Sequence, residues 1–274
     1  MSTPAWWEEP FQDLQATARE SAGRRIAVVT LDLPDKRNAM SDPMTASWVR
    51  LMALLRADPH LAAVVVTGAG SGFSAGGDLA WIVKDPDAQV IELRHRMLTF
   101  YRSWLSIKHL EVPTIAAING HAIGAGFALA LACDVRYAAA EARLGVPFTA
   151  LGLHPGMATS WSLPNVAGFA VARDLLLTGR LVTGTEALSL GLVSRVLPAG
   201  DVLAEAVTAA ERIAAAAPIA TKLTVAALRD GGHQSFEDAI EWEALAQAVT
   251  LATEDLQEGI AAAAARRAPV FRGR

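Results

Sequence analysis

The sequence contains a single cysteine and few charged residues. Cys133 is the only thiol among 274 residues, and charged side chains make up 19% of the chain, below the roughly 25% of ordinary soluble domains. One thiol excludes an internal disulfide framework and every zinc site that needs several thiolates. Lysine and arginine form no run longer than two, and the net charge is −4. These features argue against a protein that binds nucleic acid or an anionic membrane.

Two long windows, residues 112–133 and 144–172, contain no Asp, Glu, Lys or Arg. Each is long enough to cross a bilayer, but both contain proline and several glycines, which would leave backbone groups unpaired in lipid. We therefore expect buried strand–loop–helix units rather than membrane spans. The first ten residues are acidic and lack an apolar stretch, so we predict no signal peptide and a cytoplasmic protein.

Strand and helix patterns alternate along the first part of the chain. β-Branched runs predict strands at residues 24–33, 61–67, 114–118 and 135–139. Apolar residues spaced by three and four predict helices at residues 41–55, 87–110 and 127–133. Glu92 and Arg96 are expected to form an exposed ion pair on the second helix. Later helices are expected at residues 200–217, 235–253 and 255–267. The pattern predicts an α/β core at residues 1–200 and a helical segment at 201–274.

Two glycine-rich loops are candidates for a functional site. The loop at Gly68–Gly77 follows a strand, but the glycines of its Gly68–Phe73 part do not match the spacing of a dinucleotide-binding loop. Ser74 lies in a match to the GxSxG motif of serine hydrolases, and the order Ser74, Asp134, His154 would permit a catalytic triad. The preceding strand, however, ends too early for the nucleophile elbow that these enzymes need. The loop at Gly120–Gly126 lies between a strand and a helix, where small residues let backbone N–H groups approach a ligand.

Several short motifs follow one another in a fixed order. They are Leu33–Ala39, Phe73–Leu79, Ile118–Gly126, Cys133-Asp134, Leu151–Gly156, Leu177–Arg180, Ala252–Gly259 and Arg266–Phe271. Together they resemble the crotonase (enoyl-CoA hydratase/isomerase) superfamily over residues 24–272. The resemblance implies an α/β fold, a crotonase-like spiral of ββα units followed by a helical C-terminal trimerisation segment. It also implies a homotrimer or hexamer that binds an acyl-CoA substrate and needs neither a metal nor a redox cofactor.

The resemblance assigns roles to individual residues. Two backbone N–H groups, those of Gly77 and Ala125, would stabilise a thioester enolate. The residues that match the CoA-binding positions are Arg37, Ala39, Ala75, Asp78, Leu79 and Arg266. The acyl pocket would be lined by Trp81, Ala128, Phe148, Leu151 and Trp161.

One departure from the family pattern concerns the acid and base. Hydratases of the family use two glutamates, and the matching positions here hold Ala128 and Phe148, neither of which can transfer a proton. His154, in the turn beside the pocket, is the first candidate for a replacement. The other candidates are Glu92, His95 and His121, and Asp134 is interpreted as structural.

The sequence therefore predicts an acyl-CoA enzyme of the hydratase/isomerase type that works through an enolate with an atypical acid/base. An acyl-CoA-binding or sensing protein without catalytic activity would explain the loss of both glutamates more simply. A serine hydrolase that uses Ser74 is the third reading.

Overall fold

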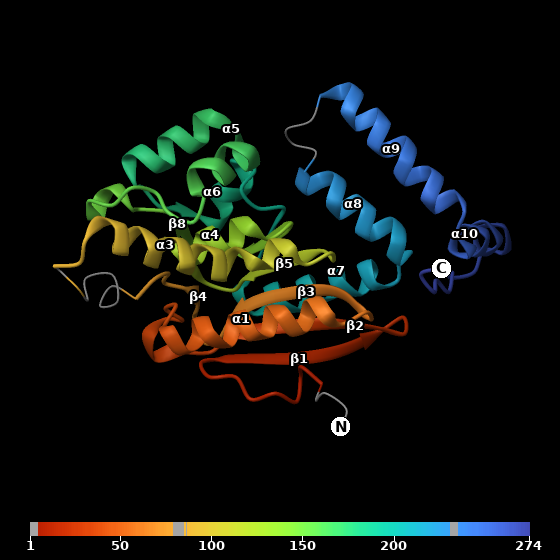
Figure 1. Cartoon of the computed structure of the whole chain (residues 1–274), viewed down its shortest axis with the longest axis horizontal. Coiled ribbons are helices and arrows are strands. Elements are labelled where there is room, and N and C mark those ends of the chain that lie inside the picture. Colours follow the sequence, from red (N-terminus) through yellow and green to blue (C-terminus); the bar gives the residue numbers. More distant parts are fainter. Residues whose placement is uncertain (1–4, 79–84, 86, 231–234) are drawn as a thin grey trace.

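The computed structural model describes residues 5–78, 85, 87–230 and 235–274, which form two sheets wrapped by helices (Figure 1). The six-stranded sheet has the order β1-β2-β3-β5-β7-β10. Its strands are β1 (Leu14–Ser21), β2 (Arg24–Leu31), β3 (Leu61–Gly68), β5 (Thr114–Ile118), β7 (Val135–Ala139) and β10 (Arg195–Leu197). The smaller sheet has the order β4-β6-β8-β9, formed by β4 (Gly72–Ser74), β6 (His121–Ile123), β8 (Arg143–Gly145) and β9 (Val182–Thr183).

Consecutive strands alternate between the two sheets. The pairs β3/β4, β5/β6 and β7/β8 each place one strand in the large sheet and the next in the small one. A helix follows each pair: α3 (Val90–Trp104), α4 (Ala125–Ala132) and α5 (Thr159–Thr178). Neighbouring strands of these units are parallel within each sheet, which requires such crossovers. The predicted α/β spiral of ββα units is confirmed.

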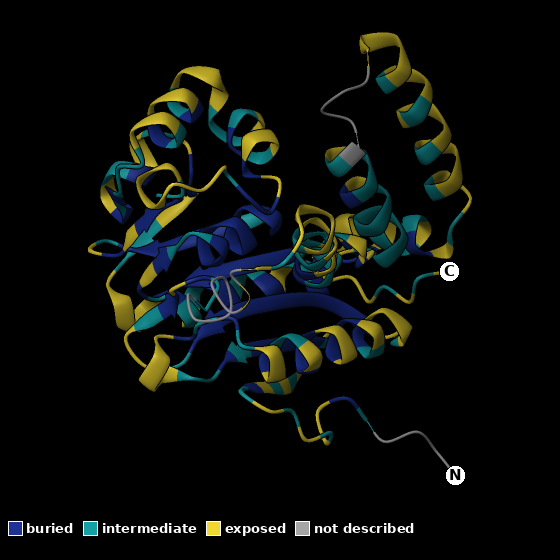
Figure 2. Ribbon diagram, turned by 60° about the vertical axis from the view of Figure 1, so that its left-hand side comes forward, coloured by how far each residue is buried: buried dark blue, intermediate teal, exposed yellow. Residues whose placement is uncertain are grey.

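The core lies between the strands and the helices that cover them (Figure 2). All eight residues of β3 and all five of β5 are buried, as expected for parallel strands covered on both faces. Helix α4 is also buried along its whole length, which explains its lack of a polar face. Trp48, on α1 (Asp42–Ala57), stacks on Trp104 with ring centroids 4.9 Å apart.

The first charge-free window forms β5, β6 and α4. The second forms β8, the short 3₁₀ helix η3 (Thr149–Leu151) and most of α5. Within the described residues, no helix has the length and hydropathy needed to cross a membrane.

The expected helix at residues 87–110 is shorter than predicted. It begins at Val90, which is 81% exposed, and at its C-terminal end the 3₁₀ helix η2 (Leu105–His109) replaces it. The predicted Glu92–Arg96 pair is wrong. Arg96 instead binds Asp85 at 2.7 Å, and the Glu92 carboxylate accepts the Gln89 backbone N–H as a helix cap.

The helical C-terminal segment divides into two parts. Helix α6 (Gly184–Ser189) joins β9 to β10, and α7 (Val202–Ala214) packs on the large sheet through Val202, Ala206, Val207 and Ala210. Helices α8 (Pro218–Asp230), α9 (Phe236–Leu251) and α10 (Glu254–Ala265) extend away from the core, and α10 lies at the end of the molecule opposite α3 and α5 (Figure 1). The segment expected from residue 201 therefore includes one helix that covers the core.

Candidate active site

The two glycine-rich loops meet between the sheet strands and α4. A Cβ on Gly76, whose φ is +91°, would lie 2.6 Å from the Ile123 carbonyl oxygen and 2.9 Å from the Ala125 nitrogen. A Cβ on Gly126 would lie 2.4 Å from the Ser74 carbonyl oxygen. Only glycine permits backbones to approach this closely. The fold thus brings the chain at Gly76 and Gly77 against the first turn of α4.

Two backbone N–H groups at this junction have no acceptor. Ala125 is the first residue of α4, where helix geometry leaves N–H groups without an intrahelical partner. Across the described residues, neither Gly77 N–H nor Ala125 N–H donates a hydrogen bond. Both residues line one cavity of about 90 Å³. Two unpaired donors beside one cavity form a site suited to a negatively charged oxygen.

The cavity is otherwise mostly apolar. The residues that line it are Gly77, Met97, Phe100, Tyr101, Ala125, Phe148, Leu153, His154, Gly156 and Met157. This set contains no carboxylate. The Phe148 ring packs beside the turn at Gly124, where a Cβ would lie 3.8 Å from Cε1. The described lining residues therefore supply no carboxylate that could transfer a proton at this cavity.

His154 is the predicted acid/base that the structure places at the cavity. Its Nδ1 lies 2.8 Å from the Pro155 carbonyl oxygen. A carbonyl only accepts, so this contact assigns the proton to Nδ1 and leaves a lone pair on Nε2. No other hydrogen bond involves this ring in the described part of the chain. The imidazole is exposed, so Nε2 is accessible for proton transfer.

A profile described as Enoyl-CoA hydratase/isomerase matches residues 21–274, almost the whole chain. The chain belongs to this family. A Thermus thermophilus relative whose name places it among the enoyl-CoA hydratases is 40% identical over 246 residues, or 90% of this chain and 97% of the relative. The 2,3-dehydroadipyl-CoA hydratase of Escherichia coli is 33% identical over 255 residues, or 93% and 98% of the two chains. An enoyl-CoA hydratase structure from Bacillus anthracis has a TM-score of 0.89 at 30% identity, and covers 96% of this chain and 100% of that one.

These findings confirm the crotonase (enoyl-CoA hydratase/isomerase) membership that the motifs predicted. In this family member, several hydrogen bonds join the first predicted CoA-binding loop to the glycine-rich loop, and three of them lie close to Gly77. Ala75 N–H donates to the Arg37 carbonyl oxygen at 2.9 Å, and Met40 N–H donates to the Gly76 carbonyl oxygen at 2.8 Å. The Ser74 hydroxyl donates to the Asn38 carbonyl oxygen at 2.8 Å. Arg37, Ala39, Ala75 and Asp78 therefore lie on two adjoining loops next to Gly77.

Ser74 is fully buried and serves the packing of these loops. Besides donating to Asn38, its oxygen accepts the Gly76 N–H at 3.1 Å. No histidine in the described part of the chain is a hydrogen-bond partner of this hydroxyl. Cys133 is also buried, and burial raises the pKa of its thiol to about 12. Neither side chain has the surroundings of an activated nucleophile.

The remaining predicted bases lie outside the cavity lining. Glu92 is occupied as a helix cap, and His95 is exposed on α3. His121 points outward from β6 and accepts the Arg143 N–H at Nδ1, 2.9 Å away. Of the four candidates from the sequence, only His154 is among the residues that line the cavity.

Several predicted acyl-pocket and CoA residues are not gathered at the cavity. Leu79 and Trp81 fall outside the described residues. Ala128 is buried on α4 and Leu151 is 59% exposed, and neither lines the cavity. Arg266 caps the C-terminal end of α10 and is exposed. That helix lies at the far end of the molecule from β4, the strand that precedes the loop of Gly77 (Figure 1).

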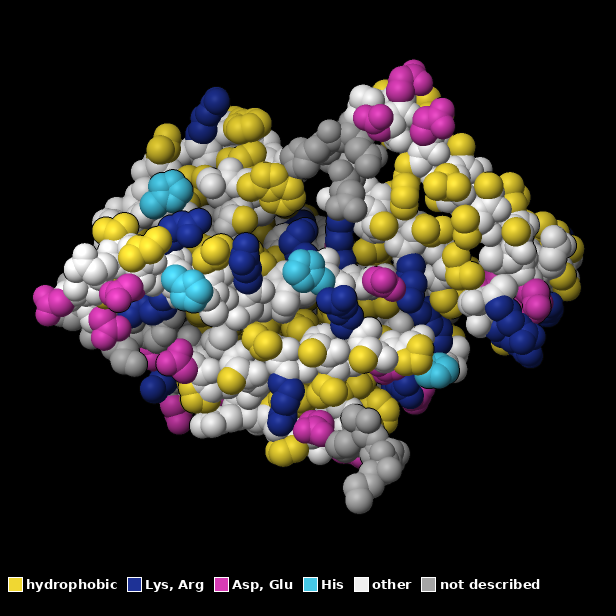
Figure 3. All heavy atoms as spheres, in the orientation of Figure 1, with side chains coloured by type: hydrophobic (Ala, Val, Ile, Leu, Met, Phe, Trp, Pro, Cys, Tyr) yellow, Lys and Arg dark blue, Asp and Glu magenta, His cyan; other side chains and the backbone are white. Residues whose placement is uncertain are grey.

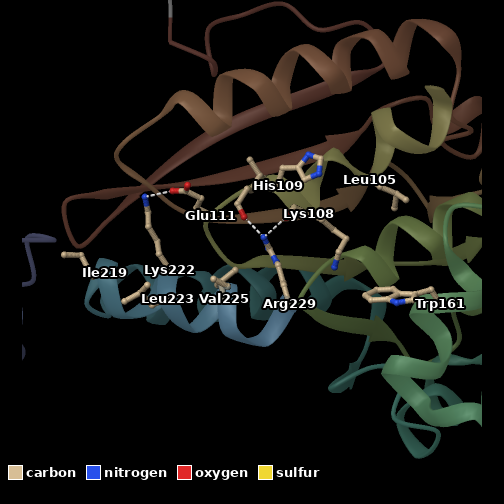
Figure 4. Close-up of a pocket in the computed structure, with 12 residues that line it drawn as sticks. Leu105, Lys108, His109, Glu111, Trp161, Ile219, Lys222, Leu223, Val225 and Arg229 are labelled. Carbon is tan, nitrogen blue, oxygen red and sulfur yellow. Dashed lines mark hydrogen bonds and ion pairs between the residues drawn. The ribbon is translucent and has the colours of Figure 1, made fainter. Parts of the chain in front are cut away.

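Trp161 lies on a different pocket from the one predicted. It borders a space of about 820 Å³ between η2 and α8 (Figure 4). There the Lys108 ammonium lies 5.7 Å from the indole centroid, and Lys222 binds Glu111 at 3.2 Å. Arg229 points from α8 to the main chain of η2 and donates to the Lys108 carbonyl oxygen at 3.0 Å. This pocket separates the core from the C-terminal helices.

Tyr101 is a cavity residue that the sequence reasoning missed. It follows Phe100 on α3, between the apolar positions that define the buried stripe of that helix. Periodicity alone gives a half-buried tyrosine at this place no special role. The signal available in the sequence was its position on the helix that ends near the predicted acyl pocket.

Proposed function

We propose that this protein is a CoA-thioester enzyme whose hydratase- or isomerase-type reaction passes through an enolate stabilised by Gly77 and Ala125. The observation that carries the proposal is the pair of unpaired N–H groups that line one cavity within the described residues. Charge develops on the thioester oxygen as the enolate forms. A fixed donor aimed at such an oxygen contributes about 3 kcal/mol to the transition state.

His154 is proposed as the atypical acid/base. Imidazole accepts and donates a proton near neutral pH, and the Pro155 contact leaves Nε2 with the lone pair needed to accept one. In hydration, Nε2 would take the proton of the attacking water. In isomerisation, it would take and return a proton of the acyl chain.

CoA would lie along the two joined loops. Backbone groups at Arg37, Ala39, Ala75, Asp78 and Leu79 would hold it by analogy with the family. The close hydrogen bonding between these loops supports a fixed surface beside the unpaired amides. Arg266 would reach a phosphate from a neighbouring subunit, because α10 lies at the opposite end of its own chain from α3, which supplies lining residues of the cavity (Figure 1).

The protein is further proposed to assemble as a homotrimer, or as a hexamer of two trimers. Helix α9 has no buried residue, and hydrophobic side chains gather over α9 and α10 (Figure 3). Phe236, Leu245 and Leu251 on α9 are 77%, 61% and 63% exposed. Exposed apolar patches of this kind mark protein contacts. A second subunit packed on α9 would bury them.

Calorimetric binding and turnover, measured together on saturated, 2-enoyl and 3-enoyl CoA thioesters, test the proposal. Conjugated-enoyl absorbance reports the chemistry. We expect His154→Ala to lower kcat by about 100-fold or more and to leave the affinity for the thioester unchanged. His121→Ala is the matched control, because this ring lies outside the cavity lining and should leave kcat unchanged.

A second candidate is an acyl-CoA-binding protein without catalysis. The absence of any carboxylate among the described lining residues favours it. Tight binding with no turnover of any thioester would establish this candidate. Turnover that His154→Ala leaves intact would instead exclude His154 as the acid/base, and no binding at all would refute both candidates.

A further inference from the structure

Tyr101 places a second proton-transfer group at the cavity. Of the ten described residues that line it, only His154 and Tyr101 carry side chains that can donate or accept a proton. Tyr101 lies on α3, whereas His154 lies on the turn after η3. Two separate elements therefore supply the two groups to the same space.

The Tyr101 hydroxyl lies where only a glycine at position 156 leaves room for it. A Cβ at residue 156 would lie 2.6 Å from Oη and 3.1 Å from Cζ of Tyr101. The phenol therefore occupies the space that a larger residue at position 156 would fill. The aromatic ring also contacts Phe100 edge-on, with centroids 6.3 Å apart. This ring contact does not engage the Tyr101 oxygen.

The hydroxyl has no protein partner. Counting every described residue, no donor or acceptor forms a hydrogen bond with Tyr101 Oη. A half-buried phenol ordinarily finds such a partner, since an unmade hydrogen bond costs about 1–3 kcal/mol. A ligand in the cavity would supply one. Burial raises the pKa of the Tyr101 hydroxyl, so at neutral pH it remains protonated and can donate.

We propose that Tyr101 is the acid that protonates Cα of the bound thioester enolate, opposite in role to His154. This inference rests on the proposed function. In hydration, the water oxygen bonds to Cβ, its proton passes to His154 Nε2, and the double-bond electrons move onto the thioester oxygen at Gly77 and Ala125. The Tyr101 O–H bond then breaks, and the enolate electron pair forms the Cα–H bond. The phenolate regains a proton from the His154 imidazolium, so one water is added in total.

Deuterium exchange at Cα of a saturated thioester, butyryl-CoA in D₂O, isolates the step assigned to Tyr101. A saturated acyl group cannot be hydrated, so exchange reports proton transfer at Cα alone. It runs the assigned step in reverse: the Tyr101 proton passes to His154 Nε2, the phenolate takes a proton from Cα, and the enolate then receives a deuteron from Tyr101 after that hydroxyl has exchanged with D₂O. We expect Tyr101→Phe to lower the exchange rate at least 100-fold while calorimetry shows unchanged thioester affinity. The chain has two tyrosines. Tyr137→Phe, on β7 and outside the cavity lining, is the matched control and should exchange like the wild type.

A second variant keeps the hydroxyl but moves it. Gly156→Ala would displace Oη through the 2.6 Å contact, and we expect exchange to fall although the tyrosine remains. Exchange that is absent from the wild type, or that Tyr101→Phe retains, would overturn the role of Tyr101. Exchange that is lost in Tyr101→Phe, with no hydration by the wild type, would support Tyr101 and refute the hydratase reaction. Hydration by the wild type that Tyr101→Phe retains would refute Tyr101 alone.

Discussion

Arg229 binds both carboxylate oxygens of Asp134, with Nε 2.8 Å from Oδ1 and Nη2 2.6 Å from Oδ2. Asp134 also accepts the backbone N–H and the hydroxyl of Thr114, at 2.7 and 2.9 Å. One carboxylate thereby joins α8 to the start of β5 and β7. This arrangement agrees with the structural role that the sequence assigned to Asp134.

Asp134→Asn should destabilise the protein by about 3 kcal/mol. The substitution leaves the partly buried Arg229 guanidinium without its counter-charge. Breaking a fully buried pair costs about 3–5 kcal/mol, and the side-chain exposure of 11% for Arg229 and 23% for Asp134 puts this pair at the lower end. Urea unfolding at pH 7 measures the change. Glu254→Gln is the control, since its pair with Arg274 is exposed and contributes at most about 1 kcal/mol. Equal effects of the two substitutions would contradict the prediction.

The same pair gives the stability a dependence on acid pH. Burial raises the pKa of Asp134, but the Arg229 guanidinium and the Thr114 donors outweigh it, and the net pKa is lowered. A lowered folded-state pKa contributes stability that is complete above the unfolded value of about 3.9. That contribution is lost as the pH falls through the folded-state value. We expect the difference in unfolding free energy between wild type and Asp134→Asn to shrink as the pH falls from about 5 to about 2. Urea unfolding of both proteins at several pH values in this range measures it.

Gly76→Ala should lower kcat, whereas an alanine at another glycine of positive φ should affect stability alone. The new Cβ would lie 2.9 Å from the Ala125 nitrogen and push this donor from its place. We expect a loss of about 100-fold in kcat if the thioester enolate forms here. Gly23→Ala is the matched control, because Gly23 also has a positive φ but open space around it. Equal stability losses and an unchanged kcat in both variants would refute the prediction.

Ser74→Ala should keep thioester binding and turnover and lower stability by about 1 kcal/mol. The substitution removes two hydrogen bonds, one to the Asn38 carbonyl oxygen and one from the Gly76 N–H. Calorimetry with a CoA thioester and thermal unfolding measure the two effects. A serine hydrolase would behave differently, because loss of its nucleophile would abolish hydrolysis.

Leu245→Glu should reduce the size of the assembly. Leu245 lies on α9 and is 61% exposed, and a carboxylate there would be buried without a partner in a subunit interface. Light scattering should show a lower mass for this variant than for the wild type. Leu177→Glu, on α5 and 76% exposed, is the control for a surface charge alone. A monomeric wild type would refute the assembly itself.

Local patterns in the sequence predicted much of the fold. The β-branched runs became β2, β3, β5 and β7, and the apolar spacing of three and four became α1 and α7, because these signals depend only on neighbouring residues. Strand β1 was missed, since its inward positions hold Leu14 and the two alanines Ala16 and Ala18, and alanine carries little strand signal. The 3-residue strands of the small sheet were missed because pairing with distant segments defines them.

Two features of the site follow from the order of residues alone. Gly76, Gly77 and Ala125 lie on two glycine-rich loops, and no glutamate stands at positions 128 and 148. Three other features depend on how distant segments pack together. The two loops meet, Arg96 binds Asp85 instead of Glu92, and Tyr101 lines the same cavity as His154. The reason is physical. A glycine permits a close approach, but which backbone approaches it depends on the order in which distant strands pair.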